Sequence, residues 1–179
     1  MVIKSLIKLI DEAIIPAVVL ILAKMIGILA SSYLFNLNFE IKSGSFLFFL
    51  PSINFLDIKD YILAENYSNF TMVLAAVLGT LIVLIRLHFL HESHVHPKLQ
   101  LKLASISLEK IISPSYHLYH KVTIWLIFLW LTVAFLVLST IYKITYLPIT
   151  LTAIFVALNL TWITILDIEK EIDISRNKT

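Results

Sequence analysis

Four long runs of apolar residues dominate the chain, and segments richer in polar residues separate them. A helix needs about 20 apolar residues to cross the hydrocarbon core of a membrane, and a run of that length with few charges predicts a membrane span. We place the spans at about 16–35, 70–90, 118–142 and 148–166. The sequence therefore predicts an all-α protein, an integral membrane four-helix bundle, with residues 1–179 forming a single membrane domain.

The residues before the first span have a different pattern. Between residues 2 and 14, apolar residues recur with a helical period, and charged residues such as Lys8 and Asp11 fall on the other side. This pattern predicts an N-terminal amphipathic helix in the membrane interface. Pro16 favours the start of a new helix, because the first helical position needs no backbone donor. A signal peptide is the alternative for this region, but Lys24 within the apolar run favours a retained span.

Two connections between the spans are long. Residues 36–68 form an outer loop that stays rich in aromatic and apolar residues, which predicts packing at the mouth of the bundle or a place in the headgroup layer. Residues 91–113 form a cytoplasmic loop, and its part 98–112 has neither a helical nor a strand period, so we assign no element there. Ser113 before a proline predicts the start of the third helix.

The composition supports a membrane protein and excludes several kinds of chemistry. Of the residues, 59% are hydrophobic and only 15% charged, whereas soluble domains have about 25% charged residues. The chain has no cysteine, which excludes disulfides, thiolate nucleophiles and cysteine-ligated metal clusters. A net charge of +2 gives no indication of a nucleic-acid partner. Serine-hydrolase and zinc-protease motifs are also absent.

Basic residues are distributed unevenly between the two sides of this predicted bundle. Since cytoplasmic loops of membrane proteins carry an excess of Lys and Arg, the richer side is predicted to be cytoplasmic. Both termini lie on that side, which predicts a multi-pass protein of the cell membrane with its N and C termini in the cytoplasm. The richer side has Lys4, Lys8, Arg86, Lys98, Lys102, Lys110, Lys121, Lys170, Arg176 and Lys178, and the other side has Lys42, Lys59 and Lys143.

All six histidines fall within one stretch of the chain, between residues 88 and 120. Histidine is the commonest protein ligand for transition metals, and a spacing of three places imidazoles on one broad face of a helix. The alternative interpretation is that histidines at the membrane boundary contact lipid headgroups. If a metal ion is bound, the candidate ligands are His88, His91, His94, His117 and His120.

Lys24 is the second candidate feature, because an ionisable residue within a span is costly and often functional. The predicted spans supply no acidic residue at its depth, and three neutral polar residues fall near mid-membrane instead. We therefore expect an intramembrane polar layer, which either lines a path for a small polar ligand or forms hydrogen bonds between helices. The predicted layer consists of Lys24, Thr80, Thr132 and Asn159.

These features leave three functional hypotheses. The first is a non-catalytic small membrane subunit or interaction protein, whose partners are membrane lipids and either other proteins or further copies of the chain. The second is a transition-metal-binding membrane protein or oxidoreductase that uses the histidines at the cytoplasmic face. The third is a small channel or transporter whose path crosses the Lys24 layer.

Overall fold

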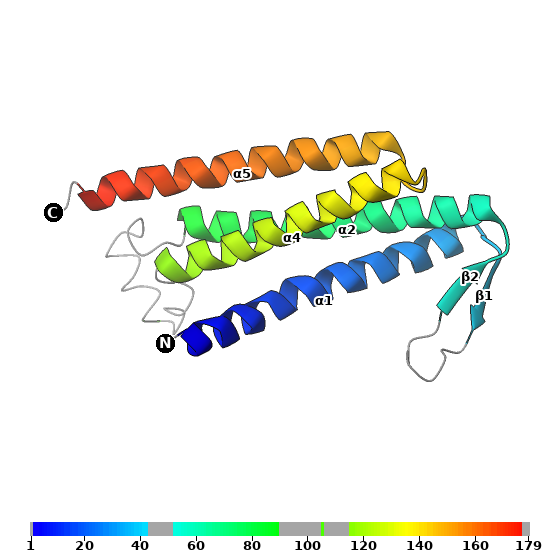
Figure 1. Cartoon of the computed structure of the whole chain (residues 1–179), viewed down its shortest axis with the longest axis horizontal. Coiled ribbons are helices and arrows are strands. Elements are labelled where there is room, and N and C mark those ends of the chain that lie inside the picture. The colour runs from blue at the N-terminus through cyan, green and yellow to red at the C-terminus, as the bar shows by residue number, and fades with distance from the viewer. Residues whose placement is uncertain (1, 43–51, 90–104, 106–114, 177–179) are drawn as a thin grey trace.

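The computed structural model describes residues 2–42, 52–89, 105 and 115–176. Long helices dominate this part of the chain, and a two-stranded antiparallel hairpin joins the first two of them (Figure 1). The elements are α1 Val2–Leu34, β1 Phe39–Lys42, β2 Ser52–Phe55, α2 Ile58–Phe89, α4 Ser115–Ile141 and α5 Leu147–Arg176.

The structure confirms the predicted fold class. Each of these helices contains a stretch that is long and apolar enough to cross a membrane, and α4 closely matches the predicted third span. Apolar side chains cover much of the bundle's outside, as expected for a surface that contacts lipid. The protein is therefore an all-α, multi-pass membrane protein. Its spans lie within Ile10–Leu34, Ile58–Phe89, Leu118–Ile141 and Leu147–Lys170.

α1 differs from the sequence prediction at its start. One helix runs from Val2 to Leu34, and Pro16 lies buried inside it rather than in the first turn of a second helix. The predicted boundary at Pro16 is therefore wrong. A proline within a membrane helix removes one backbone hydrogen bond, and packed neighbours can satisfy the freed group. The side chains of residues 2–9 lie outside the described part, so an amphipathic face remains a prediction.

α2 begins at Ile58, about three turns before the predicted start at Phe70. The predicted outer loop 36–68 is consequently wrong over its last part, which is helical. Polar residues in this stretch look like loop residues in the sequence, but Asn66 and Asn69 are only 2% and 0% exposed. These polar residues are therefore part of a long helix and pack against neighbouring elements.

α2 and α4 each pack against the other three helices, and the contact between α1 and α2 is the most extensive. Small residues allow the closest approaches. A Cβ added at Gly27 of α1 would lie 2.6 Å from the Cα of Ser68 in α2, and one added at Gly79 of α2 would collide with the Trp125 ring of α4. The bundle therefore depends on small residues at two helix crossings, although the sequence contains no GxxxG motif.

Tight caps end α1 and α4. Asn36 and Lys143 have φ values of 49° and 59°, in the left-handed region that commonly terminates helices. After α4, the amide of Ile144 donates to the carbonyl of Ser139 at 2.9 Å, which closes the cap. The chain then turns directly into α5 and carries Thr145 toward α2.

The two ends of the bundle differ in content. Figure 1 shows that α1 begins and α5 ends at one end, which we call the histidine end because His88 and His120 lie there. The opposite end carries β1, β2 and the turn between α4 and α5, and we call it the hairpin end. α1 and α2 project beyond the α4–α5 turn at the hairpin end (Figure 1).

Candidate functional site

The strongest candidate site surrounds Lys24, near the hairpin end. Its ammonium donates to the carboxylate of Glu65 and, at 3.0 Å, to the side-chain oxygen of Asn69, both from α2. The same ammonium lies 4.9 Å from the ring centroid of Phe135 in α4, a cation–π contact. These contacts engage Lys24 with two acceptors from α2 and an aromatic ring from α4. The arrangement is thus suited to holding helices and recognising an acceptor.

Asn69 extends this site to the α4–α5 turn. Its amide nitrogen donates to the hydroxyl of Thr145 at 2.7 Å, and both residues are buried. One turn earlier, Asn66 donates to the carbonyl of Ile144 at 2.8 Å and accepts from the amide of Tyr146 at 2.7 Å. Two asparagines of α2 therefore satisfy the polar backbone and side chains of the turn, which lipid could not do.

Hydroxyl groups bring the backbones of α1 and α2 together beside Lys24. Ser68 donates to the carbonyl of Lys24 and Thr71 to the carbonyl of Ala23, each at 2.9 Å. These contacts lie beside Gly27, where an added Cβ would collide with Ser68 and Thr71 of α2. The site is thus built on a rigid crossing of α1 and α2.

The expectation that Lys24 lacks an acidic partner is wrong. Glu65 supplies the carboxylate, and it lies in the segment 36–68 that the sequence pattern predicts to be a loop. A usable signal was present, because Glu65 and Asn69 are four residues apart and would share one face of a helix. The polar residues Glu65, Asn66, Ser68 and Asn69 interrupt the apolar pattern that predicts a membrane span.

The other members of the predicted polar layer lie elsewhere. The hydroxyls of Thr80 and Thr132 donate to carbonyls of their own helices at 2.8 and 2.9 Å. Asn159 is exposed and donates to a carbonyl of its own helix at 2.7 Å. Within the described residues, no hydrogen bond joins these three residues to Lys24, so the structure does not assemble the layer as predicted.

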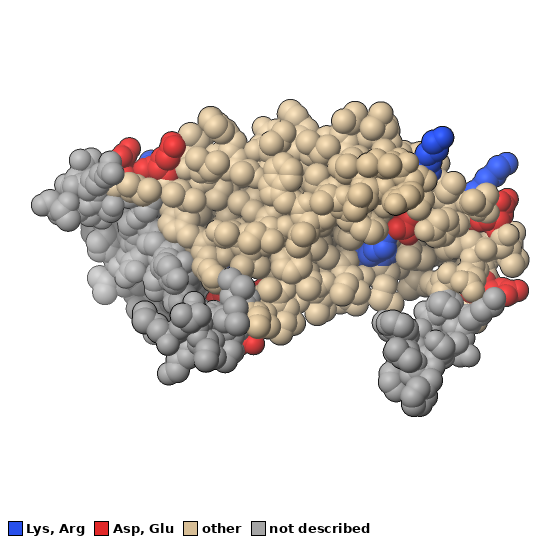
Figure 2. Space-filling view, in the orientation of Figure 1, with Lys and Arg blue, Asp and Glu red and all other residues tan. Residues whose placement is uncertain are grey.

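The Lys24–Glu65 pair opens onto the side of the bundle. The two side chains retain 28% and 11% of their exposure. Figure 2 shows one adjoining basic and acidic group surrounded by uncharged atoms, while the other visible charges gather toward the two ends. The position beside Phe135 places the opening between α1 and α4. A charged pair therefore reaches a surface that is otherwise apolar.

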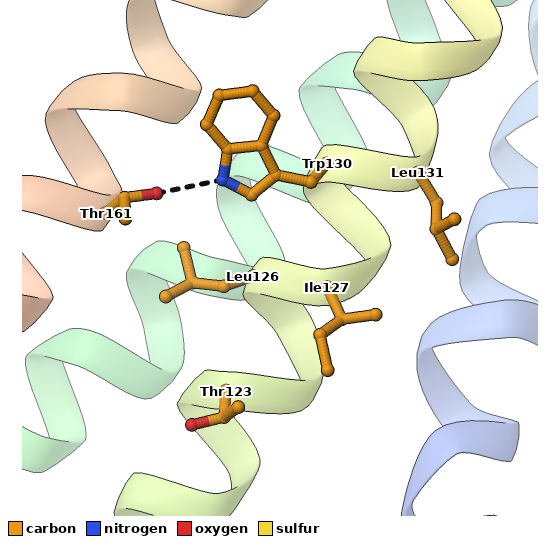
Figure 3. A pocket seen from close by; sticks show the side chains of 6 residues that line it. All are labelled: Thr123, Leu126, Ile127, Trp130, Leu131 and Thr161. Carbon is orange, nitrogen blue, oxygen red and sulfur yellow. Dashed lines mark hydrogen bonds between the residues drawn. The ribbon is translucent and has the colours of Figure 1, made fainter.

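α4 presents an apolar face beside this opening. We call it the lateral face of α4, defined by Ile127, Trp130, Leu131 and Phe135, which are 37% to 58% exposed. A shallow groove of about 350 Å³ lies along it, and Figure 3 shows Trp130 on the side toward α5 and Leu131 on the side toward α1. The indole of Trp130 donates to the hydroxyl of Thr161 at 3.0 Å. The groove therefore presents a mainly apolar surface, and the indole donor of Trp130 is already satisfied within the protein.

Two predicted metal ligands can be placed at the histidine end. His88 of α2 lies 3.3 Å from a carboxylate oxygen of Asp167 in α5, and His120 of α4 lies 3.3 Å from one of Glu12 in α1. Each pair links two different helices, and it is an ion pair when the imidazole is protonated. The Asp167 contact places that carboxylate beside a histidine of another helix.

The remaining candidate ligands lie outside what the structure describes. His91 and His94 fall in the segment 90–104, and the side chain of His117 in α4 is also outside the described part. Among the described residues, no group of three or more His, Asp or Glu side chains is arranged to hold a metal ion. The described histidines therefore face separate carboxylates, and a metal site with the other histidines remains a prediction.

Comparison with known proteins adds no family assignment. No protein-family model matches the chain, no curated protein matches it, and no solved structure shows a match to its fold. The geometry of the described residues is consequently the basis for a functional hypothesis.

Proposed function

We propose that the chain is a non-catalytic subunit of a membrane protein assembly and that it binds a partner through the lateral face of α4 and the adjoining Lys24–Glu65 opening. The observation that carries this proposal is the charged pair on an apolar, lipid-facing surface. Charged side chains are costly next to hydrocarbon and normally face the protein interior or a water-filled cavity. A partner that covers the opening removes this cost.

The chemistry of the opening favours a transmembrane helix as that partner. Lys24 and Glu65 neutralise each other, so a second charged group is not required. An ammonium has three donor hydrogens, and the structure assigns two of them to Glu65 and Asn69. The third is suited to a hydroxyl or carbonyl oxygen on a partner helix, of the kind that joins helices in membranes.

The lateral face of α4 gives such a helix a surface to pack on. Ile127, Leu131 and Phe135 are four residues apart and form one ridge along α4. The groove beside Trp130 runs along this ridge and would accept the side chains of an antiparallel or parallel neighbour. Packing and one or two hydrogen bonds are the main forces that join helices in lipid.

The proposed orientation of the bundle in the membrane places the Lys24–Glu65 opening at a defined depth. The Lys and Arg asymmetry in the sequence supports a cytoplasmic histidine end and an external hairpin end in the cell membrane. The Lys24–Glu65 opening then lies in the outer half of the membrane. A partner helix that crosses the membrane beside α4 would present its oxygen at that level.

Site-specific photo-crosslinking in native membranes tests the proposal. A photoreactive phenylalanine analogue replaces Leu131 on the lateral face of α4 or, as the control, Phe155 on the lipid-facing side of α5. We expect a protein adduct of defined mass from position 131 and none from position 155. An adduct of twice the chain's mass would identify the partner as a second copy, whereas adducts with lipid alone at both positions would refute the proposal.

A second variant tests whether the crosslinked adduct depends on the Lys24–Glu65 pair. Replacing Lys24 with Met and Glu65 with Leu together removes both charges while retaining apolar volume. We expect this double variant to fold and to give a weaker adduct from position 131, because the partner loses its hydrogen-bonding site. An unchanged adduct would show that the apolar ridge alone recruits the partner.

A further inference from the structure

The β-hairpin at the hairpin end has one apolar and one polar face. Its register pairs Phe39 with Phe55 and Ile41 with Ile53, and these side chains share a face because alternate residues of a strand point the same way. Glu40 pairs with Asn54 on the opposite face. The hairpin is therefore amphipathic across its sheet.

Part of the apolar face is exposed, because Phe39 and Ile41 are exposed whereas Ile53 and Phe55 are half-buried. The ring of Phe55 packs near Tyr61 of α2, with centroids 6.3 Å apart, and near Phe39 at the same distance. Farther along β1, Ile41 is 63% exposed. The apolar face is thus supported at its base and open toward its far end.

An isolated two-stranded hairpin is only marginally stable in water and needs a surface that buries its apolar face. The base of this hairpin is held in a definite position. The amide of Leu56 donates to the carbonyl of Asn38 at 3.1 Å, and the amide of Asn38 donates to the carboxylate of Asp60 at 3.2 Å. The surface that covers the hairpin must therefore lie beside the projecting ends of α1 and α2.

A membrane surface at this end of the bundle would meet that requirement. Figure 1 shows the hairpin hanging to one side of the bundle, with its strands leaning back toward the level at which α4 joins α5. Exposed tyrosines lie at the same end of the bundle, as in the aromatic belts at membrane interfaces. They are Tyr33, Tyr61, Tyr67, Tyr142 and Tyr146.

We infer that the hairpin is an interfacial anchor, which rests in the lipid headgroup layer with Phe39, Ile41, Ile53 and Phe55 toward the acyl chains and with Glu40 and Asn54 toward water. The register places the apolar residues on one face of the hairpin and Glu40 and Asn54 on the other, as in elements that lie in a membrane interface. The anchor fixes the height of α1 and α2 in the membrane. This inference is independent of any partner at the lateral face of α4.

Fluorescence quenching at single cysteines tests the inference, and the natural absence of cysteine makes every label unique. Cysteine replaces either Ile41 or its neighbour Glu40. Once labelled, the two positions carry the same group on opposite faces of β1. Each variant carries a polarity-sensitive fluorophore in phosphatidylcholine vesicles. We expect the label at 41 to emit at shorter wavelength and to be quenched several-fold more by spin-labelled lipid than by iodide, with the opposite preference at 40.

The cross-strand partners provide a second, independent pair. Cysteines at Ile53 and Asn54 should repeat the behaviour of positions 41 and 40, because the register places them on the same two faces. Equal access of iodide to all four labels would overturn the inference and indicate a hairpin that stands in water. Shielding of positions 41 and 53 from both quenchers would also overturn it, because a protein partner would then cover the apolar face.

Discussion

Removing the charge of Lys24 should destabilise the bundle, because Glu65 would remain largely buried without its cation. The change Lys24→Met keeps most of the apolar volume and removes the donor to Glu65 and Asn69. The sequence alone shows no acidic partner for Lys24, and it therefore predicts the opposite result. On that basis, Lys24→Leu would leave the stability of the bundle unchanged or increase it. The structure therefore reverses the expected sign.

The size of the effect follows from the burial of the two groups. Breaking a buried ion pair by removing one partner typically costs about 3–5 kcal/mol. The Lys24 side chain is 28% exposed and Glu65 is 11% exposed, which reduces the cost, and the lost hydrogen bond to Asn69 adds about 0.6 kcal/mol. We expect Lys24→Met to lower the free energy of unfolding by about 2–4 kcal/mol.

A double-mutant cycle separates the pair from its surroundings. Replacing both charges, in Lys24→Met with Glu65→Leu, should return stability to within about 1 kcal/mol of the wild type, because apolar residues often replace a buried ion pair without loss. The coupling energy between the two positions should then be about 2 kcal/mol or more. The free energies come from SDS-induced unfolding in mixed micelles, monitored by circular dichroism.

Exposed Lys59, which also belongs to α2, provides the control, and Lys59→Met should change the unfolding free energy by less than about 0.5 kcal/mol. The reasoning would be refuted if Lys24→Met unfolded at the same SDS fraction as the wild type. It would also be refuted if the double variant were as unstable as the single one, since the cost would then arise from packing rather than from an unpaired charge.

Three further predictions concern the helix crossing, the α4–α5 turn and the topology. Gly27→Ala should destabilise by about 1–3 kcal/mol in the same assay, because its new methyl group meets the backbone of α2. Asn66→Ala should cost about 2–3 kcal/mol, because it leaves the amide of Tyr146 without its acceptor. Cysteines placed at Glu40 and Asp173 should react with an impermeant thiol reagent from opposite sides of the membrane, with position 173 reacting from the cytoplasm.

Matched changes elsewhere check these predictions. Ala30→Val adds volume to the exposed side of α1 and should have little effect, in contrast to Gly27→Ala. Asn159→Ala removes an amide that bonds only within its own helix among the described contacts, so its cost should be well below that of Asn66→Ala. Equal effects within either pair would argue against the specific contacts, and labelling from one side at both cysteines would exclude the four-span arrangement.

The sequence alone was sufficient to predict the four helices that are long and apolar enough to cross a membrane, although not all of their boundaries. Transfer of a helix into lipid depends on the length and hydrophobicity of a continuous segment, which are local properties. The predicted third span, 118–142, accordingly coincides closely with α4, Ser115–Ile141. An even number of spans also brings the beginning of α1 and the end of α5 to the same end of the bundle, as Figure 1 shows.

The start of α2 and the partner of Lys24 depended on contacts between distant segments. Glu65 and Asn69 are polar residues at the edge of an apolar run, and their local sequence is as compatible with a loop as with a helix. They are helical because Lys24, more than 40 residues earlier, and Thr145, more than 70 residues later, satisfy their polar groups. Such long-range hydrogen bonds have no local signature.

The sequence by itself therefore determined how many helices enter the membrane and which residues are apolar enough to meet lipid. Only the tertiary structure decided which polar residues meet one another, because burial in a low-dielectric environment makes each charge depend on a specific neighbour. Within the described residues, Thr80, Thr132 and Asn159 bond to carbonyls of their own helices rather than to Lys24. A hydroxyl or amide on a helix can satisfy itself on a carbonyl one turn away, whereas a lysine needs an acceptor from another helix, and α2 provides it.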